Sequence, residues 1–212
     1  MLLHNSLKGL KLVLASKSPR RQHLLAELGV PFEVRLNGEV DESYPPDLPH
    51  TEIPVYLAQK KAKPLLKTLA ENEVLITSDT IVWCSEQVLG KPTDRSDAIA
   101  ILQELSGKRH DVITGVSLIF KGNEHSFAAT TQVFFKELSQ EEIIYYVDKY
   151  KPYDKAGAYG IQEWIGYVGV ERIDGSYFNV MGLPVQRLYT ELQSFIQKLE
   201  SPKTNRQPTT DN

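Results

Sequence analysis

The stretch LKLVLASKSPRRQHLLAELG at residues 10–29 passes from an apolar run through a polar turn into a helical pattern. The apolar residues 10–15 predict a buried strand. Ser18 is a favourable N-cap, Pro19 suits the first helical position, and Gly29 supplies the stop. A strand that leads directly into a capped helix favours an α/β fold.

The rest of the chain mixes strands and helices without strict alternation. Apolar or β-rich runs predict strands at residues 73–83, 112–120 and 127–135, the last two joined as a hairpin. Helical patterns lie at residues 55–63 and 98–105, after the capping box of Ser139 and Glu142, and in a last helix through Lys198. This irregular order predicts a mixed, twisted sheet with flanking helices rather than a purely parallel sheet.

Composition narrows the class of protein. With 212 residues, 41% hydrophobic and 24% charged, we expect one domain over residues 1–199 and a polar, disordered tail at 200–212. A formal net charge of −3 argues against binding a nucleic-acid backbone. The lone Cys84 excludes a disulfide framework within the chain, and no leader or membrane-spanning run is visible. We therefore expect a cytoplasmic protein without a membrane or nucleic-acid partner.

Two features suggest chemistry. The SPRR turn at residues 18–21 combines a helix N-terminus with two guanidiniums, which suits a polyphosphate. It is equally compatible with an ordinary capped helix carrying two solvated arginines. Asp79 interrupts an apolar strand, where a carboxylate is costly unless it is hydrogen-bonded, paired or metal-bound. The alternative is a structural role, in which neighbouring hydroxyl groups hold the Asp79 side chain, and we favour a functional role.

Other candidates are weak when taken singly. Lys91 lies in a Gly-Lys-Pro turn, and lysines cluster on the helix at residues 55–63, where a solvated surface is the default reading. Glu42 could complete a hard-cation site with Asp79, and the amide of Gln162 could hydrogen-bond a base edge or a structural partner. The five histidines share no metal-ligand spacing.

Taken in order, six blocks resemble the Maf family of nucleoside triphosphate pyrophosphatases. They are LASKSPRR, LAQKKA, SDTIV, LGKP, DKAGAYGIQ and GSYFNVMGLP. The resemblance runs from about Leu12 to the last helix, and the AGAYGIQ block resembles the branch that acts on dTTP and UTP. It implies a bilobed α/β fold with a central cleft, similar to the Maf and ITPase folds.

The resemblance also implies residue roles. Asp79 would be the proton acceptor, and Glu42 with Asp79 would hold a divalent Mg²⁺ or Mn²⁺ ion. The triphosphate would be bound by Ser16, Arg20, Arg21, Lys61 and Lys91, and pyrimidine preference would be set by Arg20, Thr80 and Gln162. The sequence departs from the family pattern at two places. Lys60 adjoins Lys61, so the lysine assigned to the triphosphate is open by one residue. Glu163 and Trp164 replace the small residues that often follow Gln162.

We therefore expect a metal-dependent pyrophosphatase that converts dTTP and UTP, and modified pyrimidine nucleotides, to the monophosphate and diphosphate. The resemblance further implies a homodimer. Two alternatives stay open at this point: a nucleotide-binding regulator of septum formation without hydrolysis, and a pyrophosphatase acting on methylated GTP.

Overall fold

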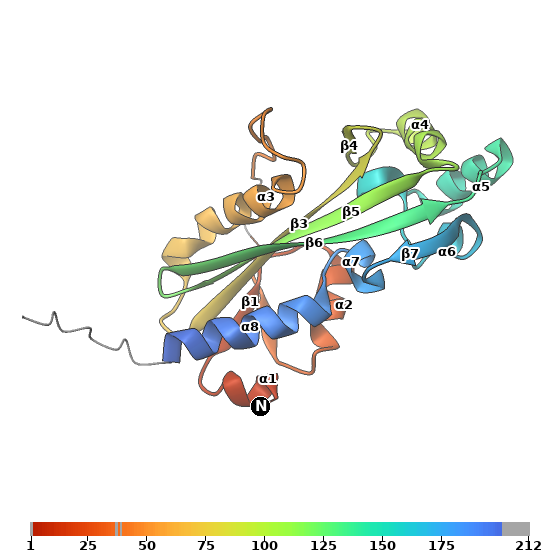
Figure 1. Cartoon of the computed structure of the whole chain (residues 1–212). Coiled ribbons are helices and arrows are strands. Elements are labelled where there is room, and N and C mark those ends of the chain that lie inside the picture. The colour runs from red at the N-terminus through yellow and green to blue at the C-terminus, as the bar shows by residue number, and fades with distance from the viewer. Residues whose placement is uncertain (1, 37, 39, 201–212) are drawn as a thin grey trace, which may run out of the picture.

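A seven-stranded mixed sheet forms the centre of the molecule (Figure 1). The computed structural model describes residues 2–36, 38 and 40–200. The strands are β1 Lys11–Leu14, β2 Phe32–Val34, β3 Glu73–Cys84, β4 Gln87–Leu89, β5 Arg109–Phe120, β6 Asn123–Phe135 and β7 Val170–Asp174. Their order is β2-β1-β3-β5-β6-β7, with β4 paired to β3 off this path. β1 runs parallel to β2 and β3, and the other pairs are antiparallel, which confirms the expected mixed sheet.

Helices cover both faces of this sheet. They are α1 Leu3–Ser6, α2 Pro19–Ala26, α3 Ile53–Ala62, α4 Arg95–Leu105, α5 Gln140–Tyr150, α6 Trp164–Gly169, α7 Tyr177–Met181 and α8 Val185–Glu200, with 3₁₀ turns η1 Lys63–Thr68 and η2 Ala156–Ala158. In Figure 1, α3 lies above the long strands, α1 and α8 lie below them, and α4, α5 and α6 gather at the far end.

Local sequence signals explain several element boundaries. Ser18 caps α2 by accepting the backbone N–H of Arg21, and the capping box of Ser139 and Glu142 begins α5, both as expected. Helix α3 ends at Ala62 and gives way to the 3₁₀ turn η1, because Pro64 cannot continue an α-helix.

Some boundaries differ from the sequence expectation. Helix α3 begins earlier than predicted, with Pro54 in its first turn, and α8 continues to Glu200 rather than ending at Lys198. The remainder of the tail predicted to be disordered, residues 201–212, lies outside the described residues. Cys84 is buried and free, and none of the helices described is long and apolar enough to cross a membrane.

The buried side chains form two main cores that meet at a polar seam. The first half of β3 contributes Val74 and Ile76 to a core shared with α1, α2 and α8. Its last residues, Val82 and Cys84, belong to a second core with α4 and α5. Between them β3 reads Thr-Ser-Asp-Thr at residues 77–80, and the first three of these polar residues, including Asp79, are buried. The strand therefore passes a polar segment between two apolar cores, and the candidate site lies there.

Candidate active site

A cavity of about 620 Å³ opens beside the polar middle of β3. It is lined by the turn before α2, by α3, β3, the turn after β4, the segment around η2, and the end of α7. Every residue to which the sequence assigns a site role lines it: Ser16, Arg20, Arg21, Glu42, Lys61, Asp79, Thr80, Lys91 and Gln162. Segments far apart in the sequence are thus gathered around one cavity.

Asp79 lies at the centre of this arrangement. It occupies the middle of β3, opposite Gly115 of β5, and is only 7% exposed. The Lys61 ammonium, delivered from the last turn of α3, forms an ion pair with its carboxylate. A buried carboxylate is stabilised by such a partner, so Asp79 is held as part of a charged pair rather than by hydroxyls alone.

Lys61 also joins Glu42 to the site. The Glu42 Oε1 atom lies 2.9 Å from Lys61 Nζ, so one ammonium contacts two carboxylates. Partial burial acts to raise the pKa of Glu42, but the Lys61 hydrogen bond and the Lys61 and Lys91 charges outweigh it and lower that pKa. The neighbouring Lys60 points elsewhere and pairs with Asp41 at 2.8 Å, which places Lys61 rather than Lys60 at the site.

The two arginines after Pro19 have different surroundings. Arg21 donates from Nε to Gly182 O at 2.8 Å, from Nη1 to Ser78 O at 2.9 Å, and from Nη2 to Thr80 Oγ1 at 2.8 Å. Burial lowers the pKa of Arg21 below its ordinary value, although the nearby Asp79 acts in the opposite direction. Arg21 therefore ties α2 to β3 and to the end of α7, a structural use that the sequence does not predict.

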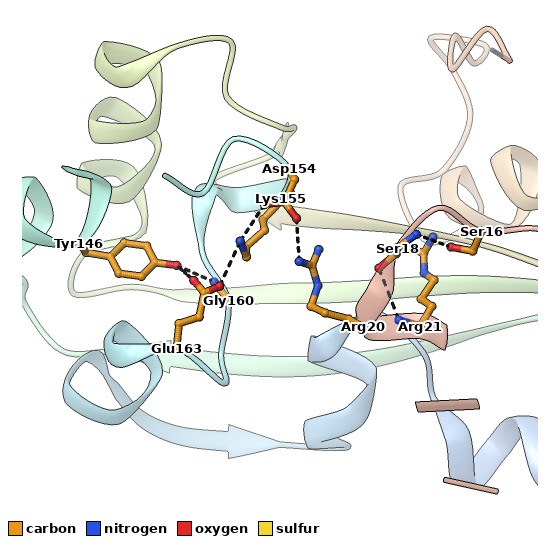
Figure 2. A network of polar contacts seen from close by, with 9 residues as sticks. All are labelled: Ser16, Ser18, Arg20, Arg21, Tyr146, Asp154, Lys155, Gly160 and Glu163. Carbon is orange, nitrogen blue, oxygen red and sulfur yellow. Dashed lines mark hydrogen bonds and ion pairs between the residues drawn. The ribbon is translucent and has the colours of Figure 1, made fainter. Parts of the chain in front are cut away.

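Arg20 is more available. Its guanidinium makes one ion pair, from Nη1 to Asp154 Oδ2 at 2.8 Å, as Figure 2 shows. Ser16 also faces this turn: its Oγ accepts the backbone N–H of Ser18 at 3.2 Å, and its carbonyl accepts the amide of Gln22.

Two buried polar atoms at the cavity have no partner among the described residues. They are Ser78 Oγ and Gln162 Oε1. Buried polar atoms are costly when unpaired, so a site that leaves them open is suited to a ligand that supplies the missing hydrogen bonds. Thr80 is different, because its hydroxyl already contacts Arg21 and lies 2.9 Å from Thr114 Oγ1.

Sequence reasoning missed a second group of charged residues at this cavity. Asp154 and Lys155 line it, and Glu163 and Tyr146 stand behind them (Figure 2). The signal was present in the DKAGAYGIQ block, which opens on a carboxylate and an ammonium. Asp154 pairs with Arg20 of α2, and Lys155 pairs with Glu163 just beyond the block, and a linear pattern does not show which charged residues meet.

The cations at the cavity suit a small polyanion. No group of three or more His, Cys, Asp or Glu side chains able to hold a metal ion occurs in the part of the chain that the structure describes. Cations from α2, α3 and the turn after β4 converge on a cavity in a protein of net charge −3. Local positive potential is sufficient to attract a small anionic ligand.

The family comparison and the similar curated proteins agree with each other. The model of the family described as "Maf-like protein" matches residues 11–195. The chain is 55% identical over 190 residues to the dTTP/UTP pyrophosphatase of Parabacteroides distasonis, covering 90% of this chain and 98% of that protein. It is 46% identical over 193 residues to the dTTP/UTP pyrophosphatase of Porphyromonas gingivalis, covering 90% and 97%. Among solved structures, a nucleoside-triphosphatase / dITP/XTP pyrophosphatase from Mycobacterium abscessus matches with a TM-score of 0.41 at 13% identity, covering 91% of this chain and 100% of that chain.

Proposed function

The chain belongs to the Maf family, and from that premise we propose that it is a nucleoside triphosphate pyrophosphatase that hydrolyses dTTP and UTP. The products are the nucleoside monophosphate and pyrophosphate, and modified pyrimidine nucleotides fall in the same substrate class. The observation that carries the proposal within this chain is Asp79, a buried carboxylate ion-paired to Lys61 at a cavity lined by further cations.

Asp79 has the chemistry of a proton acceptor. Cleavage between the α- and β-phosphates requires an oxygen nucleophile to approach an anionic phosphorus atom. A carboxylate beside that phosphorus accepts the proton that water loses as it attacks, and burial keeps bulk water from competing for it. The Lys61 ammonium forms an ion pair with the Asp79 carboxylate and so fixes its position at the cavity.

The cations supply the matching charge. Arg20, Lys61 and Lys91 come from three separate segments and line the same cavity. A triphosphate carries negative charge along its length, so cations placed around it bind the ground state and stabilise charge that develops on the leaving pyrophosphate. Ser16 adds a hydroxyl at the helix start, where backbone N–H groups also favour an anion.

The donor set fits a divalent metal ion that is shared with the substrate. Glu42 and Asp79 both contact Lys61 Nζ, so two carboxylates converge on one cationic position. Mg²⁺ is commonly bound by one or two carboxylates together with phosphate oxygens, and the two residues present meet that requirement. Glu42 and Asp79 would hold Mg²⁺ or Mn²⁺, which when bound would act as a Lewis acid on phosphate oxygens.

Gln162 supports pyrimidine preference. Its Oε1 atom is buried, unpaired among the described residues and located at the cavity, and its amide offers a donor beside that acceptor. The O4 and N3–H groups of uracil and thymine present the complementary pair, whereas the adenine edge presents it in reversed order. Arg20 and Thr80 line the same cavity and complete the set that we propose for base preference.

We extend the proposal to the setting of the protein. The absence of a nucleic-acid partner is in keeping with the net charge of −3, a cytoplasmic setting is in keeping with a free, buried Cys84, and the homodimer follows from the family resemblance. Light scattering coupled to size-exclusion chromatography tests the dimer directly. A monomer at micromolar concentration would remove that part of the proposal and leave the activity untouched.

The activity is tested with a panel of nucleoside triphosphates and inorganic pyrophosphatase as the coupling enzyme. We expect dTTP and UTP to be turned over faster than ATP, GTP and methylated GTP. Asp79→Asn should fold normally and lose about 10²–10⁴-fold in kcat, because a proton acceptor is lost. Faster turnover of methylated GTP would move the chain to another branch of the family, and a folded Asp79→Asn enzyme with normal kcat would remove Asp79 from the mechanism.

Gln162→Ala tests base recognition separately. The substitution should lower kcat/KM for dTTP and UTP more than for ATP, because an unpaired buried group costs about 1–3 kcal/mol. An equal loss for every nucleotide would show that Gln162 supports the loop and that the base is recognised elsewhere.

A further inference from the structure

The two arginines of the SPRR turn leave different edges for a ligand. Arg21 uses Nε, Nη1 and Nη2 on protein acceptors. Arg20 uses only Nη1, and within the described ranges its Nε and Nη2 atoms have no protein acceptor. The Nε–Nη2 edge is one of the edges through which a guanidinium binds two oxygens of a phosphate at once. Arg20 therefore keeps its Nε–Nη2 edge available to two oxygens of an anion, while its Nη1 atom donates to Asp154.

Asp154 is itself held from two sides. Its Oδ2 accepts from Arg20 Nη1 at 2.8 Å, and its Oδ1 accepts from Lys155 Nζ at 2.8 Å. Burial acts to raise the pKa of Asp154, but the hydrogen bonds and charges of Lys155 and Arg20 lower it to about 2. Asp154 is thus ionised at neutral pH. Its side chain is 58% exposed, so without these contacts it would be free to rotate in solvent.

The contacts continue into the core. The Lys155 side chain is 9% exposed, and its Nζ also lies 3.1 Å from Glu163 Oε1. The other Glu163 oxygen accepts from the hydroxyl of the fully buried Tyr146, and the same hydroxyl accepts the Gly160 N–H at 3.0 Å. Figure 2 shows this row of side chains running from Tyr146 to Arg20. A buried ammonium between two carboxylates has little freedom to move, because losing either partner leaves charge uncompensated.

We propose that Asp154 is a positioning residue of the active site, which fixes the Arg20 guanidinium so that its Nε–Nη2 edge faces the triphosphate. The proposal rests on the proposed function, which places a triphosphate beside Arg20. Lys155 and Glu163 brace Asp154 from behind. Because the Lys155–Glu163 ion pair also closes the loop that carries Gln162, the orientation of Arg20 is tied to the segment that recognises the base.

A double-mutant cycle tests whether Asp154 acts through Arg20. We expect Asp154→Ala to lower kcat/KM for dTTP about 10-fold to 100-fold, the size of effect that a misplaced binding group produces. In an Arg20→Ala background, Asp154→Ala should have no further effect. Asp148→Ala is the matched control, because it removes another exposed Asp–Arg pair, between Asp148 and Arg95, that does not line the cavity.

Binding of inorganic tripolyphosphate gives a second measurement, and its sign separates orientation from charge. Removal of the Asp154 charge adds net positive charge beside the anion, which by itself would tighten binding. Loss of Arg20 orientation weakens it. We expect titration calorimetry to show weaker binding to Asp154→Ala, partial recovery in Asp154→Asn, which keeps an oxygen acceptor, and no change in Asp148→Ala.

Two results would overturn the proposal: multiplicative effects of Asp154→Ala and Arg20→Ala, or tighter tripolyphosphate binding by Asp154→Ala. If wild-type protein turned over neither dTTP nor UTP, the proposed function would fall. The calorimetric cycle with tripolyphosphate would still decide whether Asp154 and Arg20 are coupled. Should Asp154→Ala be unfolded by circular dichroism, Asp154→Asn takes its place in the cycle, and additivity there would count against the proposal.

Discussion

Neighbouring residues on one helix turn contact different parts of this molecule. Lys60 and Lys61 both lie in the last turn of α3. The Lys61 ammonium contacts Asp79 and Glu42 at the cavity, whereas Lys60 Nζ donates to Asp41 Oδ2 and Ser43 O on the outer loop. Successive side chains on a helix point about 100° apart, so a shift of one position moves a side chain from the cavity to the outer surface. The side-chain direction settles a register that the KKA motif leaves open.

This pair of lysines provides a matched prediction. Lys61→Met should lower kcat with dTTP about 10²–10³-fold, because a cation directed at developing negative charge is lost. Lys60→Met should change kcat less than about twofold, since exposed ion pairs contribute little. Both variants should be checked by circular dichroism before steady-state kinetics. Equal losses in the two variants would contradict the different roles that we assign to them.

A buried histidine makes stability depend on pH. His110 is 1% exposed, its Nε2 lies 2.7 Å from the Tyr159 hydroxyl, and burial lowers its pKa to about 3. In the unfolded chain a histidine side chain has a pKa of about 6.5. Between these values the unfolded state binds a proton that the folded state does not, so the free energy of unfolding falls as the pH falls through this window.

Because of His110, we expect the free energy of unfolding of the wild-type protein to be about 2 kcal/mol lower at pH 5 than at pH 7. Urea unfolding at the two pH values measures this, and His110→Gln is the comparison because it cannot be protonated. Carboxylates with a lowered pKa, such as Glu73 at about 2, stabilise the fold at any pH above their unfolded pKa of about 4.5. Their contribution to the free energy of unfolding is therefore nearly constant between pH 7 and pH 5. The same pH dependence in both proteins would exclude His110 as its source.

At the scale of elements, one glycine lets α3 approach the sheet. Gly115 of β5 is the register partner of Asp79, and a Cβ atom there would lie 2.2 Å from the carbonyl carbon of Pro54 in α3. Thr77 Oγ1 also donates to Ala58 O at 2.7 Å, which fastens the helix to β3. The helix that carries Lys61 is thus seated on the sheet directly across from the carboxylate that Lys61 contacts.

Gly115→Ala should therefore damage the site as well as the packing. The added methyl group must push α3 away from the sheet, which typically costs about 1–3 kcal/mol and should also separate Lys61 from Asp79. Gly122→Ala is a suitable control, because Gly122 has a φ of +75° and open space around it at the β5–β6 turn. It loses stability through backbone strain alone.

The two glycine variants are compared by thermal unfolding and by kcat for dTTP, measured well below both melting temperatures. Reduced kcat in Gly115→Ala together with normal kcat in Gly122→Ala is the expected result. Normal kcat in both would show that α3 tolerates the displacement.

Elements whose signals are local were predictable from the sequence, and those that depend on tertiary contacts were not. The capping box of α5 and the β5–β6 hairpin follow from neighbouring residues. The short helix α6 has no side-chain cap, and α7, although capped by Ser176 and ended by Gly182, has only five residues. Helix α7 depends on Asn179, whose Nδ2 donates to Val112 O and Thr131 Oγ1 on two distant strands. Helices this short are not stable alone, so tertiary contacts decide whether they form.

At the scale of the whole molecule, the polar middle of β3 links two cores to one cavity. The motifs predict nine residues that the cavity gathers, because the motif segments meet at the same seam in the fold. The brace from Tyr146 to Asp154 was not predictable in this way. Its members pair across α5 and the DKAGAYGIQ loop, and a linear pattern of single charged residues does not reveal which of them meet.

A ligand in this cavity should stabilise both cores together. The cavity is lined by Met181, which packs against both cores, and by Val82 and Tyr159, which belong to the α4 and α5 core. Bound nucleotide touches side chains that are in contact only in the folded state, so it adds stability by mass action. A non-hydrolysable α,β-imido dUTP at 100 times its Kd should add about 2.7 kcal/mol.

For a chain of this length, that stabilisation should raise Tm by about 5–10 °C, because about 1 kcal/mol shifts Tm by about 2–4 °C. Far-ultraviolet circular dichroism follows the helices of both cores, and tryptophan fluorescence of a Trp83→Phe variant follows Trp164, which packs against the α4 and α5 core. We expect the two signals to give one coincident transition that the nucleotide moves as a whole, with a smaller shift for the matched ATP analogue. Two transitions, of which the nucleotide moved only one, would mean that the cores unfold separately and that the ligand is bound by one of them alone.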